Sequence, residues 1–244
     1  RYLDTLSEES VFFNEFGIGG TPSTCDKSLF ENQTIKSRMF FRGDVAKKID
    51  GIRNGIKNLN CSEEEKNYFL LFLLHYIDKY ANTSAVYGAY LKYDKFPDKN
   101  VDFVSKELIE AFKRKRRDVV FRQGDIFETL RSIPYDSRNI FYLDPPYNTR
   151  RYESNYHILN YIVDLDFKIE DIKINSKTAM PVKQKENLFA SKKTFKDAFR
   201  LMMSYAMEKS DLIYISFNSE GEFTQSDMEE YIREHSLILE TFTK

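Results

Sequence analysis

The stretch Asn139-Ile140-Phe141-Tyr142-Leu143-Asp144-Pro145-Pro146-Tyr147 decides the fold class. Residues 140–143 form a short run of apolar residues that favour β-structure, which predicts a buried strand. The two prolines end this strand because each fixes φ and lacks a backbone N–H. In open α/β sheets, ligands bind at the carboxyl ends of the strands. Residues 144–147 are therefore predicted to lie at a ligand site.

These four residues combine hydrogen-bond acceptors with an aromatic face. The Asp144 carboxylate and the Pro145 carbonyl could each accept one hydrogen of an exocyclic amine on a planar ring such as adenine. The amine lone pair would then point at an incoming methyl group, and fixed negative dipoles would stabilise the positive charge that develops on nitrogen. Asp144 could pass the surplus proton to water, and Tyr147 would stack on a base flipped out of its duplex. The alternative interpretation is an ordinary turn after a strand.

Outward from this site, the hydrophobic pattern of the C-terminal half alternates between the period of strands and the period of helices. Strands are expected at 119–121, 140–143, 212–217 and 237–242, and helical segments at 125–131, 154–163, 195–206 and 225–235. This alternation predicts a mostly parallel, covered sheet and hence the α/β class. The polar, lysine-rich residues 168–194 suit a DNA-facing lid and a solvated loop equally well.

The N-terminal half instead predicts helices. Apolar residues recur every three or four positions from Val45 to Leu59, and Ser62 begins a capping box with Glu65. Further helical segments are expected at 68–77 (apolar nearly all round and therefore buried), 84–92 and 104–112. Residues 1–43 carry most of the glycine and turn chemistry and are expected to be loop up to Asp44. The chain thus divides into a helical region, residues 1–116, and an α/β region, residues 117–244.

Composition limits the class of protein. Of the 244 residues, 41% are hydrophobic and 31% charged, which excludes a disordered or collagen-like chain. The longest apolar run, seven residues at 68–74, is far too short to cross a membrane. Cys25 and Cys61 suit neither a metal site nor a disulfide framework, so we expect no metal and a cytoplasmic location. The 37 basic and 38 acidic residues nearly cancel, so any nucleic-acid site must be local.

The tetrapeptide and its surroundings resemble the bacterial adenine-specific DNA methyltransferases of restriction–modification systems. The matching segments are Asp144-Pro-Pro-Tyr-Asn-Thr-Arg-Arg-Tyr, Asn155-Tyr-His-Ile-Leu-Asn, Ala81-Asn-Thr-Ser-Ala-Val-Tyr-Gly-Ala-Tyr-Leu-Lys, residues 40–53 and Ile215-Ser-Phe-Asn-Ser-Glu-Gly. The resemblance implies a Rossmann-like methyltransferase sheet, incomplete at its N-terminus, with residues 1–116 containing a DNA-recognition insertion. It further implies methyl transfer from S-adenosylmethionine to adenine N6 in double-stranded DNA, and a cognate restriction endonuclease as partner.

The resemblance also assigns cofactor-binding residues. Gly124, Asp125 and Ile126 match a turn whose acidic residue and following backbone N–H hold the adenine ring of S-adenosylmethionine, and Asp144 borders the same cofactor. The family's glycine-rich cofactor turn has only a superficial counterpart in Phe16-Gly17-Ile18-Gly19-Gly20, because no apolar strand precedes it and no periodic helix follows. We therefore expect the first strands of the sheet to lie upstream of Arg1, so that the chain is a piece of a longer protein.

Local basic clusters are the candidate phosphate contacts. They are Lys113, Arg114, Lys115, Arg116 and Arg117, and, directly after the candidate site, Arg150 and Arg151. The first cluster is equally consistent with a solvated helix end, whereas the second favours phosphate contact beside a flipped base. His157 is expected to be a packing or orienting residue rather than a catalytic one. Asn82, Tyr87 and Lys92 match family positions without an evident physical role.

Two other functions fit the same residues. The chain could be a non-catalytic DNA-binding or scaffold piece of such an enzyme, since half of the cofactor site is missing from the sequence. It could also methylate adenine in RNA, because similar acceptor-rich turns serve that reaction. Cofactor binding separates the first alternative from the enzyme, and competition between DNA and RNA separates the second.

Overall fold

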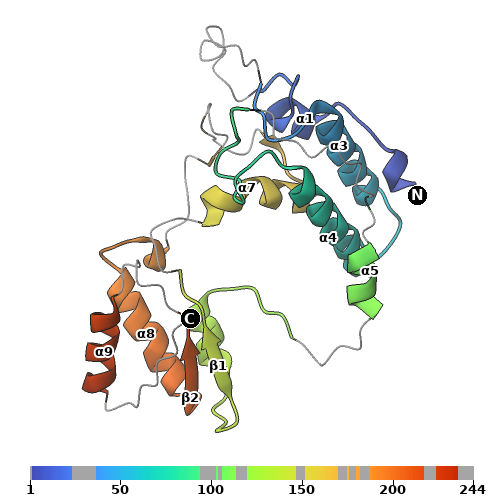
Figure 1. Ribbon diagram of the computed structural model, residues 1–244. Coiled ribbons are helices and arrows are strands. Elements are labelled where there is room, and N and C mark those ends of the chain that lie inside the picture. The colour runs from blue at the N-terminus through green and yellow to red at the C-terminus, as the bar shows by residue number, and fades with distance from the viewer. Residues whose placement is uncertain are drawn as a thin grey trace. The chain divides into compact units, whose positions relative to one another are not determined.

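The chain forms two compact units in a computed structural model (Figure 1). The first unit comprises Arg1–Arg116 and Tyr152–Gln184, and the second comprises Arg117–Arg151 and Lys185–Lys244. Residues 152–184 thus pack with the N-terminal unit, although the sequence prediction grouped them with the α/β region. The structure describes residues 2–23, 37–93, 103, 106–113, 120–146, 152–169, 175, 180–181, 187–216 and 224–235.

The first unit is helical. It contains η1 (Leu3–Thr5), α1 (Val11–Phe16), α3 (Gly43–Lys57), α4 (Glu63–Tyr80), α5 (Lys106–Lys113) and α7 (Tyr152–Val163). The predicted stripe on α3 is confirmed, since Val45, Ile49, Ile52 and Ile56 are all buried in one core with residues of α1, α4 and α7. None of the described helices combines the length and hydrophobicity that a membrane span requires.

The predicted start of α4 is also confirmed. The Ser62 hydroxyl accepts from the backbone N–H of Glu65 at 3.2 Å, and the Glu65 carboxylate accepts from the Ser62 N–H at 2.8 Å. The expectation that residues 68–77 are buried all round is wrong, because Tyr68 and Leu71 are exposed. Helix α4 therefore buries one face, as a helix at the surface of a unit does.

Two further expectations for this unit are wrong, for reasons outside the local sequence. Residues 84–92 form bends and turns rather than a helix. Conversely, α1 lies in the region expected to be loop, and its first turn is held by Asp50 of α3. The Asp50 carboxylate accepts from the backbone N–H groups of Phe12 and Phe13 at 3.0 and 2.6 Å. Six residues are too few for a stable helix without such a tertiary contact.

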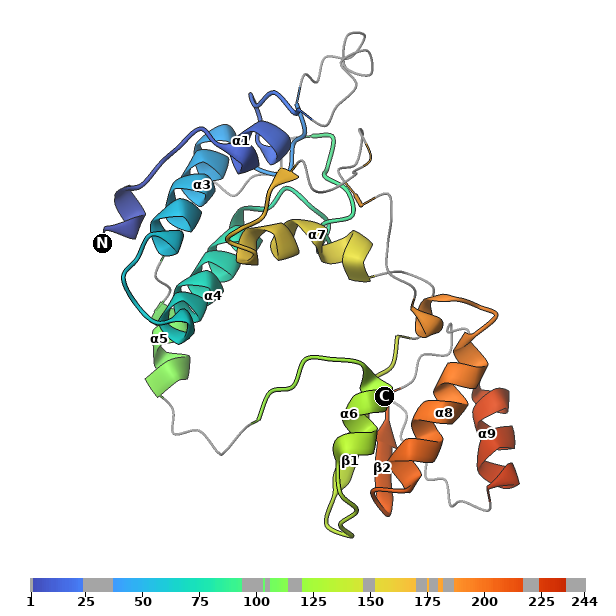
Figure 2. The same ribbon diagram turned by 180° about the vertical axis from the view of Figure 1, so that it is seen from behind.

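The second unit contains the sheet. Its elements are α6 (Ile126–Ser132), β1 (Ile140–Leu143), η3 (Leu188–Ala190), α8 (Phe195–Met207), β2 (Leu212–Ile215) and α9 (Gln225–Glu234) (Figure 2). Strands β1 and β2 are parallel, in a register that pairs Ile140 with Leu212 and Leu143 with Ile215. Helix α8 lies between them in the sequence, and its apolar stripe shares one core with α6 and Leu143. The unit is thus a small parallel sheet with helices, compatible with a methyltransferase fold.

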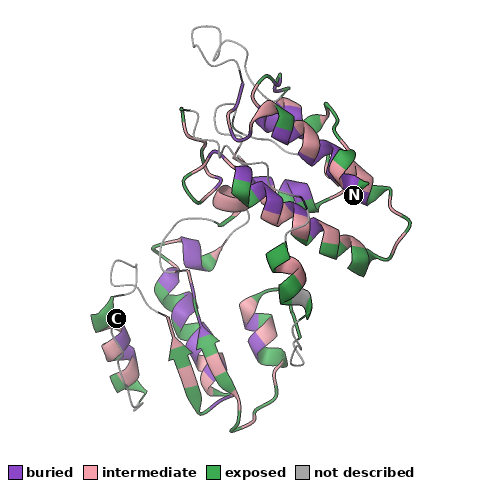
Figure 3. Ribbon diagram, turned by 45° about the vertical axis from the view of Figure 1, so that its right-hand side comes forward, coloured by how far each residue is buried: buried purple, intermediate pink, exposed green. Residues whose placement is uncertain are grey.

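The strands differ from the prediction in two respects. The strand expected at 119–121 is not formed at Val120 and Phe121, which are exposed and have no sheet partner among the described residues. Strand β1 forms where predicted, but only Leu143 is buried, while Ile140 and Tyr142 are exposed (Figure 3). The strand expected at 237–242 lies outside the described residues.

Candidate functional site

The candidate site begins where β1 ends. The Leu143 carbonyl accepts from the backbone N–H of Ser216 at 2.8 Å, so the parallel pairing continues to the last residue of the strand. The chain then leaves the sheet over Asp144, Pro145 and Pro146, which have no regular secondary structure. The two prolines thus end the ladder as their chemistry predicts. Tyr147, Arg150 and Arg151 lie outside the described residues.

Asp144 and Pro145 differ sharply in exposure. The Pro145 ring is buried and anchors the turn, whereas the neighbouring Asp144 side chain is exposed. Within the described part of the chain, the Asp144 carboxylate makes no hydrogen bond or ion pair. Both of its oxygens are therefore available as acceptors at the carboxyl end of a parallel strand, where ligands of such sheets bind.

The predicted cofactor turn, 124–126, lies in the same unit as this turn. Asp125 is the N-cap of α6, and its Oδ1 accepts from the backbone N–H groups of Phe127 and Glu128 at 2.9 and 3.2 Å. Phe127 and Leu143 belong to the same core, so the start of α6 and the end of β1 are both held by it. Capping occupies one carboxylate oxygen of Asp125 and leaves Oδ2 without a hydrogen bond or ion pair to the described residues.

The basic clusters are mostly outside the described residues, which include only Lys113 of the seven. Lys113 ends α5, is exposed, and forms an ion pair with Glu110 one turn earlier at 2.8 Å. An exposed pair of this kind does not exclude phosphate contact, because a polyanion can replace a weakly held carboxylate.

His157 is buried in the first unit. Its Nδ1 lies 3.0 Å from the Ser154 carbonyl, and its ring packs edge-on against Phe40 and Tyr161. Burial lowers the pKa of His157 to about 4. The ring is therefore neutral at pH 7, with the proton on Nδ1 donated to the carbonyl, and these contacts agree with the expected packing role.

The structure supplies a role for Asn82, which sequence reasoning did not explain. Its backbone N–H donates to the Phe40 carbonyl at 2.8 Å, and its side-chain amide donates to the carbonyls of Met39 and Leu91 at 3.0 Å each. Asn82 is buried, and it joins the segment before α3 to both ends of the loop 82–91. An asparagine two residues after a helix end is a typical turn residue, which is the signal that could have identified it.

Tyr87 attaches the same loop to α7. Its backbone N–H donates to the Asn155 carbonyl at 2.7 Å, and its hydroxyl lies 3.5 Å from the Asp78 carboxylate. Between these anchors, Ala85 has a φ of 76°, a conformation that residues other than glycine rarely adopt. The loop is thus held in one strained shape, and Lys92 near its end is exposed.

The glycines at 16–20 serve packing in the first unit. A helix, α1, precedes them rather than the strand that a cofactor turn requires. A Cβ on Gly20 would lie 2.2 Å from the Phe13 carbonyl oxygen, and one on Gly17 would lie 2.7 Å from the Ala46 Cβ. Close approach of neighbouring atoms therefore accounts for Gly17 and Gly20, and a φ of 87° accounts for Gly19.

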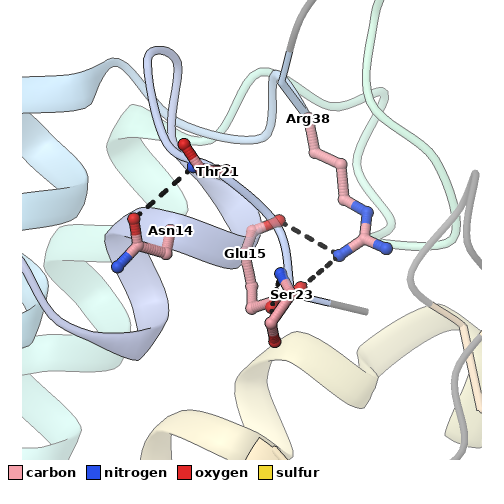
Figure 4. A network of polar contacts seen from close by, with 5 residues as sticks. All are labelled: Asn14, Glu15, Thr21, Ser23 and Arg38. Carbon is pink, nitrogen blue, oxygen red and sulfur yellow. Dashed lines mark hydrogen bonds and ion pairs between the residues drawn. The ribbon is translucent and has the colours of Figure 1, made fainter. Parts of the chain in front are cut away.

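A buried ion pair holds the segment 14–23, which contains these glycines. Glu15 of α1 and Arg38 approach to 2.6 Å, and both side chains are almost completely buried. The other Glu15 oxygen accepts from the N–H and hydroxyl of Ser23, while Thr21 donates to Asn14 (Figure 4). These contacts close the segment 14–23 on itself and join it to the chain at Arg38.

Comparisons with known proteins agree with the resemblance in the sequence. The profile of the D12 class N6 adenine-specific DNA methyltransferases matches residues 18–230. The type II methyltransferase M.NlaIII of Neisseria lactamica is 34% identical over 188 residues, 75% of this chain and 52% of that protein. M.CviAII of Paramecium bursaria Chlorella virus 1 is 33% identical over 200 residues, 79% of this chain and 55% of that protein.

A third relative is the type II methyltransferase M.FokI of Planomicrobium okeanokoites, which is 30% identical over 215 residues. That match covers 82% of this chain and 30% of M.FokI. The chain thus spans about half the length of M.NlaIII and M.CviAII and less of M.FokI. No solved structure matches the chain.

Proposed function

Because this chain belongs to the D12 class of N6 adenine-specific DNA methyltransferases, we propose that it carries the target-base half of such an enzyme. The reaction is methyl transfer from S-adenosylmethionine to adenine N6 in double-stranded DNA. The observation that carries the proposal is the exposed Asp144 beside the buried Pro145 at the carboxyl end of a parallel strand, within the matched residues 18–230. A cytoplasmic restriction–modification system with a cognate endonuclease is part of the proposal.

The acceptors at this turn would act on the target amine. The Asp144 carboxylate and the Pro145 carbonyl accept its two hydrogens, which directs the nitrogen lone pair away from them. A preorganised carboxylate stabilises the positive charge that grows on nitrogen without having to reorient. Asp144 then takes the surplus proton and passes it to water, as its exposure allows. Tyr147 stacks on the flipped base.

The start of α6 fits one end of the cofactor. S-adenosylmethionine supplies the methyl group when it is bound. Asp125 has an oxygen that capping leaves free, and the N–H of Ile126, at the first position of α6, makes no hydrogen bond with the described residues. These two groups suit the amino group and a ring nitrogen of adenine, with Gly124 leaving space beside them. Because the Asp125 carboxylate caps α6, the direction of its side chain is fixed.

DNA contact is proposed for the basic clusters and the helical unit. Lys113, Arg114, Lys115, Arg116 and Arg117, with Arg150 and Arg151, would bind phosphates, since the nearly neutral chain offers no general attraction. The helical residues 1–116 would contain the recognition insertion, and residues 117–244 the catalytic part. We propose that the sheet of the second unit is part of a Rossmann-like methyltransferase sheet.

The experiment is methyl transfer to adenine in duplex DNA, measured with labelled S-adenosylmethionine and by mass spectrometry of N6-methyladenine. Asp144→Ala is expected to reduce transfer by at least 10³-fold, because it removes the main electrostatic contact. Asp197→Ala is the matched control, since Asp197 is an exposed carboxylate on α8 of the same unit. Near-normal transfer by Asp144→Ala would contradict the proposed role.

A second candidate function for a chain of this family is DNA binding without catalysis. Calorimetry separates the two, because S-adenosylmethionine should bind the catalytic form at micromolar concentration and the scaffold form not at all. Competition of duplex RNA with DNA in the transfer assay tests the RNA alternative.

A further inference from the structure

Three polar side chains lie in a row along one face of α7. Glu153, His157 and Tyr161 are four residues apart, so each lies about one turn beyond the last on the same side of the helix. Glu153 Oε2, His157 Nε2 and the Tyr161 hydroxyl are all buried atoms, and none of them has a hydrogen-bond partner among the described residues. We call these three atoms the polar row.

The surroundings of the polar row are apolar and closely packed. His157 and Tyr161 are only 1% and 6% exposed. The Tyr161 ring stacks on Phe167 with 4.4 Å between the ring centroids, and the His157 ring packs edge-on against Phe40 at 6.4 Å. A buried polar atom without a hydrogen bond raises the free energy of the folded state, so native proteins keep few of them. Three such atoms in one row therefore point to a common partner.

The chemistry of each atom defines what this partner must offer. His157 Nδ1 lies 3.0 Å from the Ser154 carbonyl oxygen, which can only accept, so Nδ1 carries the proton and Nε2 carries a lone pair. Glu153 Oε2 is also an acceptor, whereas the Tyr161 hydroxyl can donate as well as accept. The partner must therefore donate two hydrogen bonds and accept one.

Charge excludes an ion as this partner. Burial lowers the pKa of His157 and raises that of Tyr161 to about 12, and the charge of the fully buried Arg38 lowers both values. A cation at the polar row would therefore be repelled by the Arg38 guanidinium. An anion would face the Glu153 carboxylate and the lone pair of His157 Nε2. The partner is thus a neutral molecule, and it must be small enough to lie among packed rings.

Water has both this chemistry and the required reach. Side chains one helical turn apart are separated by about 5–6 Å, and two hydrogen bonds of about 2.8 Å each through one water molecule span the same distance. Buried waters typically make about three hydrogen bonds to groups that have no other partner. We propose that one buried water molecule binds at His157 Nε2, donates its second hydrogen to Glu153 Oε2 and accepts from the Tyr161 hydroxyl.

This water site gives His157 a role beyond packing, because Nε2 holds the molecule that joins three successive turns of α7. The helix follows residues 144–147 in the sequence, and His157 lies in the segment 155–160 that resembles the family. The water stabilises α7 where the helix contributes Ile158, Tyr161 and Ile162 to the core of the first unit. The inference does not depend on methyl transfer.

The experiment counts long-lived water molecules in the 244-residue chain by oxygen-17 magnetic relaxation dispersion, whose signal comes from water alone. The double variant Glu153→Met/Tyr161→Phe leaves the water one hydrogen bond, too few to hold it, so the amplitude should fall by about one water molecule per chain. Tyr87→Phe is the matched control, because this equally buried hydroxyl of the same unit lies 3.5 Å from the Asp78 carboxylate. It should leave the amplitude unchanged.

The single variant Tyr161→Phe supplies a second test, which decides the matter if the double variant does not fold. A hydroxyl bonded to water contributes a hydrogen bond, so its removal should lower the urea midpoint by about 0.5 M. A buried hydroxyl without any partner would instead give a higher midpoint on removal, because the substitution would relieve an unsatisfied group.

Two results would overturn the proposal. The first is an unchanged relaxation amplitude in a double variant whose circular dichroism spectrum shows that it is folded. The second is a urea midpoint of Tyr161→Phe that is equal to or higher than that of the parent chain. Since neither readout involves methyl transfer, a chain inactive in that reaction would still pass or fail these tests.

Discussion

The buried pair of Glu15 and Arg38 makes a sharp prediction about stability. The guanidinium of Arg38 is fully buried, and the Glu15 side chain is 2% exposed. Replacing Glu15 by alanine removes the carboxylate 2.6 Å from the guanidinium and leaves the positive charge in the core of the first unit. It also removes the acceptor of two hydrogen bonds from Ser23, at 2.7 and 2.6 Å.

The expected cost follows from these contacts. Breaking a buried ion pair by removing one partner costs about 3–5 kcal/mol, chiefly because the remaining charge loses its opposite charge at a desolvated position. Loss of the Ser23 bonds adds up to about 1 kcal/mol, since Ser23 is exposed and water can replace Glu15. Glu15→Ala should therefore lower the free energy of unfolding by about 3–6 kcal/mol, a large share of the 5–15 kcal/mol of a typical domain.

The double variant Glu15→Leu/Arg38→Met separates this cause from simple loss of packing. It removes both charges and keeps most of the buried volume, so its stability should lie within about 2 kcal/mol of the parent. A cost of the double variant as large as that of Glu15→Ala would refute the reasoning. So would a cost below about 1 kcal/mol for Glu15→Ala alone.

The assay is urea unfolding followed by far-ultraviolet circular dichroism and tyrosine emission, since the chain has 16 tyrosines and no tryptophan. With a slope of about 2 kcal/mol/M, the midpoint of the first unit should fall by about 2 M. Hydrogen exchange of peptides from α1 and α3 assigns the transition to that unit. Asp166→Ala is the control, because its exposed pair with Lys57 should not shift the midpoint.

Four further predictions concern the same unit. Burial lowers the pKa of His157 to about 4, so its contribution to stability is present above the unfolded pKa of about 6.5 and is lost as pH falls towards 4, by about 3 kcal/mol. Urea midpoints between pH 7 and 4 should therefore depend less on pH in His157→Gln. Burial raises the pKa of Asp50 to about 6. The stability that this shift contributes is present below pH 3.8 and is lost as pH rises through 6. Asp50→Asn should therefore steepen the loss of stability on acidification. Ser62→Ala should cost about 1 kcal/mol in thermal unfolding through the lost cap. Asn82→Ala should cost about 2–3 kcal/mol and increase hydrogen exchange in residues 82–91, and unchanged exchange there would contradict its anchoring role.

Helices and strands with strong local signals were predictable from the sequence. Two local signals located α3 and α4: the apolar spacing from Val45 onward and the capping residues Ser62 and Glu65. An amphipathic period and a helix cap both depend only on residues close together in the sequence. The same is true of β1, where an apolar run meets two prolines. The position of Asp144 after this strand followed from the same local rule.

The failures share a different cause. Helix α1 depends on Asp50, which is 37 and 38 positions away from the N–H groups it accepts. Residues 84–92 are apolar enough for a helix, but Asn82 and Tyr87 bind them into a loop through contacts with Met39 and Asn155. Residues 120–121 favour a strand that lacks a described neighbour. In each case a distant partner, present or missing, overrides the local preference.

By itself, the sequence determined the family and predicted the chemistry of residues 144–147, since both depend on which residues stand side by side. It also determined that Asp144 follows the carboxyl end of a strand in a sheet. Only the tertiary structure decided that residues 152–184 pack with the first unit, that Glu15 and Arg38 are buried together, and that Ile140 and Tyr142 of β1 are exposed. Those properties arise from contacts between residues far apart in the chain, whose free energy depends on burial that no local pattern records.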